Sequence, residues 1–119
     1  MKAALGLDFG TESVRAMLVD LRGKELASVA VKYPHGQIIE TLPGSKRKLP
    51  PHYALQHPLD WLGSAAQAAR SARRKAKIGA ADVIGIGVDF NSTPRIWCRP
   101  RGWFAWFMIR KNGAMLNWR

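Results

Sequence analysis

An almost continuous apolar run, Val83 to Phe90 (VIGIGVDF), constrains the fold of this chain more than any other stretch. Such a run is typical of a parallel strand that is buried on both faces after a helical crossover. The preceding segment predicts the helix, since Pro58 suits a first turn, Asp60 favours the positive end of the dipole and Gly79 can end the helix. The sequence therefore predicts an α/β fold.

This helix is expected to cover one face of a sheet. Its apolar stripe consists of Leu59, Leu62, Ala65, Ala66, Ala69 and Ala72 or Arg73. In the following strand, Gly85 and Gly87 would let neighbouring backbone approach closely. They do not complete a G-x-G-x-x-G dinucleotide motif, because no third glycine follows and no helix opens there.

Three further strands are predicted near the start of the chain. Apolar runs at Ala3 to Leu7 and Val14 to Val19 flank a polar turn, and Glu25 to Tyr33 follows the hairpin turn at residues 20–24. These runs predict three antiparallel strands. Residues 34–57 contain four prolines and two glycines and are expected to form a long loop, whose length favours a functional role.

The turn between the first two strands carries the residue types of an anion site. Gly10 can adopt a positive φ and leaves room for a phosphate, while the next three residues, Thr11, Glu12 and Ser13, offer amides and hydroxyls. Asp8 can hold Mg²⁺ through water, and Arg15 can neutralise phosphate charge. The alternative is an ordinary hairpin turn that uses the same residue types for its geometry alone.

A second group of polar residues follows the apolar run. If that strand is parallel to the first, Asp8 and Asp89 end at the same edge of the sheet, and Asn91 and Ser92 face the anion loop. Ligands bind at that edge in open α/β sheets. We therefore expect one site to be formed from both strand ends.

Composition excludes several classes of function. The chain has 119 residues, no apolar run long enough to span a bilayer and no signal-peptide pattern, so we expect one domain or less in the cytoplasm, without membrane contact. Single Cys98 excludes an internal disulfide, and His35, His52 and His57 lack the spacing of a zinc site. Residues 95–119 hold six Lys/Arg and no acid, which supplies over half of the net charge of +11.

Three stretches, GLDFGTESVRAMLVDL, TLPG followed by ALQHPLDWL, and VIGIGVDF, together resemble the start of the FGGY carbohydrate kinases, and the ribulokinases among them, over about residues 3–92. The resemblance implies the first part of an actin-like, ribonuclease-H-like lobe, with ATP and a pentulose sugar bound between two lobes. Ribulokinases transfer the γ-phosphoryl group of ATP to the 5-hydroxyl of ribulose, in the catabolism of L-arabinose and other pentoses.

By position, Asp8, Gly10 and Thr11 match the first phosphate loop of this family, with Glu12, Ser13 and Arg15 beside it. Asn91 and Ser92 match the start of the sugar pocket. The resemblance thus implies ATP, Mg²⁺ and a pentulose as ligands. The acidic general base and the adenosine region of the family belong to later parts of the full-length enzymes, so we expect this chain to be inactive.

The resemblance ends abruptly after Ser92, which divides the chain at residues 1–94 and 95–119. We interpret the second part, rich in Trp and Arg, as a tail translated in a shifted reading frame. The uncovered edge of the last strand is expected to favour self-association or aggregation. Two alternatives remain: a small basic protein that binds nucleic acid, which the clustered charge does not require, and an actin-like nucleotide binder without kinase activity.

Overall fold

The computed structural model describes residues 1–90 and the strand at 107–110, in which four strands precede one long helix and two strands follow it. The elements in chain order are β1 (Ala3–Phe9), β2 (Ser13–Asp20), β3 (Glu25–Lys32), β4 (Tyr53–Gln56), α1 (Pro58–Ala76), the 3₁₀ turn η1 (Ala80–Asp82), β5 (Val83–Phe90) and β6 (Phe107–Arg110).

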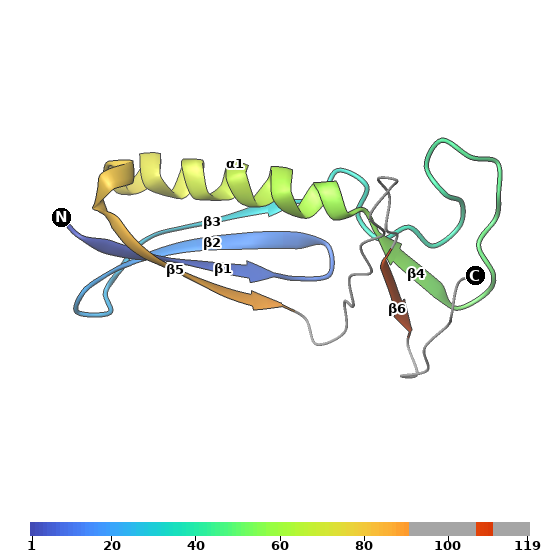
Figure 1. Ribbon diagram of the computed structural model, residues 1–119, viewed down its shortest axis with the longest axis horizontal. Helices are drawn as coiled ribbons and strands as arrows, with labels where there is room; N and C mark the ends of the chain where they lie inside the picture. The colour runs from blue at the N-terminus through green and yellow to red at the C-terminus, as the bar shows by residue number, and fades with distance from the viewer. Residues whose placement is uncertain (91–106, 111–119) are drawn as a thin grey trace, which may run out of the picture.

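The main sheet has the strand order β3-β2-β1-β5 (Figure 1). β2 pairs antiparallel with both β1 and β3, while β5 pairs parallel with β1. The prediction of three antiparallel strands, a crossover helix and one parallel strand is therefore confirmed. The β2–β3 hairpin also forms as expected, since the Asp20 side chain accepts hydrogen bonds from the backbone N–H groups of Arg22 and Lys24.

α1 covers one face of this sheet (Figure 1). The core consists of Ala3, Leu5, Phe9, Val14, Ala16, Leu18, Tyr33, Trp61, Ala65, Ala68 and Ala72. The predicted apolar stripe was wrong in its first turns, because Leu59 and Leu62 are 59% and 70% exposed. Trp61 and the alanines at helical spacing after it face the sheet instead, and a helix that buries them must turn both leucines outward.

Both ends of α1 are capped. The His57 imidazole accepts a hydrogen bond from the N–H of Leu59, and Pro58 occupies the first turn as predicted. The predicted end at Gly79 was wrong: Lys77 adopts the left-handed conformation, with φ 56°, two residues earlier. Gly79 lies beyond the helix, where its N–H donates to the Asp82 carboxylate.

The long segment between β3 and α1 is partly ordered by pairing. Its last residues form β4, a short strand absent from the prediction, which pairs antiparallel with β6. Ile38 also forms a bridge with Leu55 of β4. The four-residue strand is too short to show periodicity in the sequence, and its partner lies about fifty residues further along the chain.

β5 forms an edge of the main sheet and lies beside the area that α1 covers (Figure 1). Its apolar row, Ile84, Ile86, Val88 and Phe90, is 48–64% exposed within the described part of the chain. Burial on both faces was therefore a wrong expectation here, and the space beside Gly85 and Gly87 is open. No helix of the described residues combines the length and apolar character needed to cross a bilayer.

Candidate phosphate-binding site

The candidate site is the turn at residues 10–12, which joins β1 to β2. The N–H of Gly10 donates to the carbonyl of Ser13 at 2.8 Å and closes the turn. Gly10 does not have the positive φ that we expected. A glycine is favoured for a different reason, because a Cβ at this position would lie 3.0 Å from the Ser13 oxygen. The backbone is therefore tightly folded at this point.

The charged candidates lie on the sheet face opposite α1. Asp8 is the partner of Arg15 across the β1–β2 pair and of Asp89 across the β1–β5 pair, so the predicted meeting of Asp8 and Asp89 at one edge is confirmed. All three side chains are exposed. Within residues 1–90 none of them forms an ion pair, which leaves both signs of charge available to a ligand.

The remaining predicted residues complete this edge. Glu12 is exposed, while Thr11 and Ser13 are half-buried beside it. Lys32, which the sequence analysis did not single out, is the cross-strand partner of Ser13 and adds an exposed cation. Asn91 and Ser92 lie outside the described residues. The structure thus brings Asp8, Arg15 and Asp89 together around the turn.

A second set of residues holds the turn from the helix side. The Tyr33 hydroxyl donates to the carbonyl of Gly10 at 3.0 Å, and the Tyr33 N–H donates to the carbonyl of Glu12 at 2.9 Å. Between these two bonds, the Gln56 amide donates to the carbonyl of Thr11. All three carbonyls of the turn therefore accept hydrogen bonds, two from the Tyr33 and Gln56 side chains and the third from the Tyr33 N–H, which continues the β2–β3 pairing.

Buried groups surround this second set. The Gln56 oxygen accepts a hydrogen bond from the Trp61 indole at 3.1 Å, and both side chains are buried. Burial, with smaller contributions from the charges of Asp8 and Asp60, raises the pKa of Tyr33 from 10.0 to about 12. Tyr33 therefore remains a neutral hydrogen-bond donor at any physiological pH.

Sequence analysis missed Tyr33, Gln56 and Trp61 as residues of this site. Two signals were present: Tyr33 lies where the apolar run meets Pro34, and Gln56 and Trp61 flank the helix start. Neither signal names a partner, because the bonds to the turn span 23 and 45 residues of chain.

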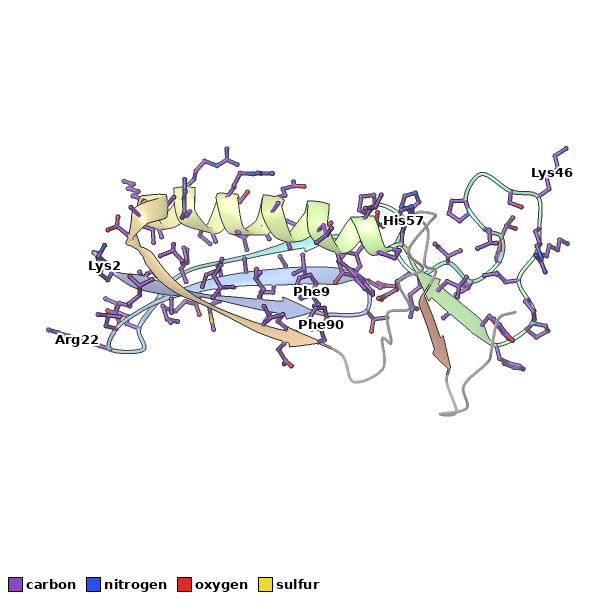
Figure 2. All side chains as sticks on the ribbon, viewed as in Figure 1. Lys2, Phe9, Arg22, Lys46, His57 and Phe90 are labelled. Carbon is purple, nitrogen blue, oxygen red and sulfur yellow. The ribbon has the colours of Figure 1, made fainter. Side chains whose placement is uncertain are left out.

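A histidine cluster lies at the start of α1, where Figure 2 labels His57. Buried Asp60 accepts hydrogen bonds from the backbone N–H of His35 at 2.8 Å and from its Nδ1 at 2.9 Å. The rings of His35 and His57 stack with centroids 4.5 Å apart and planes 14° apart. Ligand atoms of the three residues lie within 4.8 Å of one another, but parallel imidazoles direct their in-plane lone pairs side by side. This geometry favours a structural role, in which the cluster ties residues 34–36 to the helix, rather than a metal-binding role.

Comparison with known proteins gives consistent relatives, although no family model matches the chain. The chain is 48% identical over 91 residues to ribulokinases from Geobacillus thermodenitrificans and Anoxybacillus flavithermus. Each match covers 76% of this chain and 16% of the relative. The chain therefore spans about a sixth of the length of the curated relatives it matches.

Solved structures of sugar kinases share the fold. A xylulose kinase from Rhodospirillum rubrum superposes with a TM-score of 0.69, at 22% identity, over 96% of this chain and 21% of that one. A second kinase of this type, from Brucella ovis, gives a TM-score of 0.58 at 23% identity, over 74% of this chain and 16% of that one. These likenesses confirm a partial actin-like α/β fold. About three quarters of this chain is homologous to ribulokinases, and the predicted resemblance to the FGGY carbohydrate kinases is confirmed.

Proposed function

We propose that this chain carries the first phosphate loop of a ribulokinase-like sugar kinase. The complete enzyme would transfer the γ-phosphoryl group of ATP to the 5-hydroxyl of ribulose, in the cytoplasm, as a step of pentose catabolism. One observation carries the proposal: a tightly folded turn lies beside Asp8, Arg15 and Asp89 in a chain that is 48% identical to ribulokinases over 91 residues.

The residues of the turn suit the triphosphate of ATP. Backbone N–H groups and the hydroxyls of Thr11 and Ser13 are donors of the kind that phosphate oxygens accept, with Glu12 at the tip of the turn and Arg15 as a nearby cation. Gly10 lets the chain fold closely enough to present these groups. Asn91 and Ser92, next along the chain after β5, would begin the sugar pocket.

Asp8 fits a magnesium ion that keeps most of its water. Its carboxylate is exposed at the strand end and has no cationic partner within residues 1–90. Mg²⁺ usually takes only one or two protein oxygens, and here it would neutralise charge on the phosphates. Asp8 would therefore hold a hydrated ion against the phosphates.

The 119 residues by themselves are proposed to be inactive. Phosphoryl transfer needs both substrates in line in a site that excludes water, and the chain spans about a sixth of its ribulokinase relatives. A coupled assay of ADP formation with MgATP and L-ribulose should therefore give no signal above background. Turnover by the isolated chain would contradict this part of the proposal.

A chimera tests the site itself. Residues 1–92 replace the matched segment of the Geobacillus thermodenitrificans ribulokinase, and we expect ribulose-dependent ADP formation. Asp8→Asn should lower kcat by at least about 100-fold, because the ion loses its charged anchor. Asp20→Asn, in the distant β2–β3 hairpin, is the matched control.

A chimera that folds but remains inactive would overturn the kinase assignment. Nucleic-acid binding is the rival result. Steep salt dependence of binding that survives deletion of residues 95–119 would favour it.

A further inference from the structure

We propose that Tyr33, Gln56 and Trp61 are positioning residues that hold the turn at residues 10–12 in its anion-binding conformation. This inference rests on the proposed function of that turn. The three side chains, called the brace here, are 5%, 4% and 6% exposed. They come from three different segments of the chain, just after β3, from β4 and from the first turn of α1; Tyr33 and Gln56 bond the turn, and Trp61 bonds Gln56.

The brace fixes the direction of the peptide groups. A trans peptide points its C=O and the following N–H in opposite directions. Because the Gly10 and Thr11 carbonyls point toward Tyr33 and Gln56, the N–H groups of Thr11 and Glu12 point the other way. That side of the sheet carries Asp8 and Arg15.

Trp61 determines which end of the Gln56 amide meets the turn. The indole N–H is only a donor, so it must meet the Gln56 oxygen, at 3.1 Å. The amide NH₂ is then directed at the Thr11 carbonyl. With the opposite orientation, the Gln56 NH₂ would face the Trp61 N–H and the Gln56 oxygen would face the Thr11 carbonyl. Donor would then meet donor and acceptor would meet acceptor in a buried space, which is costly.

The brace is attached to the rest of the fold at both ends. Tyr33 also accepts a hydrogen bond from the N–H of Gly36, and the neighbouring His35 is tied to Asp60 in the first turn of α1. Trp61 follows Asp60 directly and packs edge-on against Phe90, with ring centroids 6.4 Å apart. Figure 2 shows Phe90 beside Phe9, which ends β1. The start of α1 and the anion loop are thus positioned as one unit.

The brace is tested by removing donors while keeping the shapes of the side chains. Tyr33→Phe removes one hydroxyl, and Gln56→Met removes both the amide oxygen and the amide NH₂ at similar side-chain volume. The matched controls are Tyr53→Phe on β4 and Gln67→Met on the exposed side of α1. Each ¹⁵N-labelled full chain is examined by NMR relaxation at the Thr11 and Glu12 amides and is then titrated with inorganic tripolyphosphate.

We expect both brace variants to lower the order parameters of these two amides and to weaken tripolyphosphate binding about tenfold, which corresponds to about 1.4 kcal/mol. The controls should match the native chain in both readouts. The circular-dichroism helix signal of each variant shows whether it is folded. If that signal is unchanged, a tenfold loss of binding cannot be attributed to loss of global stability.

The two failures are distinguishable. If the native chain does not respond to tripolyphosphate, the proposed function is contradicted, and the order parameters alone decide whether the brace holds the turn. If the native chain binds tripolyphosphate and the brace variants match it in order and affinity, the brace is overturned. A reduced order parameter with unchanged affinity also overturns it, because the positioning would then serve no ligand.

Discussion

The raised pKa of Tyr33 predicts that alkaline pH destabilises the native chain, and that Tyr33→Phe removes this effect. The pKa is about 12 in the folded chain and 10.0 in the unfolded one, so the unfolded state releases its proton first as pH rises. Above about pH 10 the folded state binds more protons, and the free energy of unfolding falls with pH. Below about pH 9 the hydroxyl is protonated in both states and contributes no pH dependence.

The magnitude follows from the two values. Between pKa values of 10.0 and about 12, the loss is about 1.4 kcal/mol at pH 11. Against this, the hydroxyl donates one partly buried hydrogen bond to Gly10, worth about 1 kcal/mol at neutral pH. The native chain should therefore be about 1 kcal/mol more stable than Tyr33→Phe at pH 8, and the two should converge near pH 11.

Urea unfolding followed by circular dichroism at 222 nm measures this difference, because α1 dominates the helical signal. Tryptophan fluorescence is less suitable, since four of the five tryptophans lie outside the described residues. Tyr53→Phe is the control and should follow the native chain at every pH. A gap between native chain and Tyr33→Phe that stays constant up to pH 11 would refute the reasoning, because Tyr33 would then titrate alike in both states.

Four further variants test the fold. Leu18→Ala should lower the free energy of unfolding by about 2–4 kcal/mol in urea, because this leucine is fully buried beneath α1. Lys77→Gly should raise it by about 0.5–1 kcal/mol, since Lys77 holds a left-handed conformation, whereas Lys75→Gly inside the helix should lower it by a similar amount. Ile86→Lys should reduce self-association in sedimentation velocity with a stability change within about 0.5 kcal/mol, because Ile86 is 64% exposed on the edge strand.

Each of these results has a clear opposite. A Leu18→Ala loss below about 1 kcal/mol would mean that the core beneath α1 is loosely packed. If glycine lowers the free energy of unfolding at position 77 as it does at position 75, the capping role of Lys77 is contradicted. If Ile86→Lys self-associates as much as the native chain, the exposed apolar row of β5 is not the surface through which the chain associates.

Much of the fold could be predicted from periodicity. The apolar run at β5 and the turn residues at 20–24 predicted a parallel strand and a hairpin correctly, because both signals act locally. The helix was also predicted, and Ala65 and Ala72 of its predicted apolar stripe are buried, but Leu59 and Leu62 of its first turns are exposed. Leucines outrank alanines as core residues in any composition argument, yet Trp61 and three alanines face the sheet. The rotation of α1 about its own axis, which sets the residues that face the sheet, is decided only by packing against β2 and β3.

The site was predicted in part for the same reason. Asp8, Gly10 and Arg15 are close in sequence, and a last strand parallel to the first was expected to end at the same edge, which places Asp89 near Asp8. The side chains that hold the turn come from distant segments, so no local pattern shows them. The histidine cluster was missed because Asp60 looked like a residue for the helix dipole, whereas its carboxylate binds His35.

Three consecutive residues of the chain have separate structural tasks: Gln56 holds the turn, His57 caps α1 and Pro58 begins it. Each residue of a helix lies about 100° further around the axis than the one before it. If Gln56 keeps its bond to the turn, one residue inserted between Gln56 and α1 would therefore rotate a different side of α1 toward the sheet. The length of this junction is therefore fixed, and insertions should be tolerated only upstream, among the exposed residues 43–48.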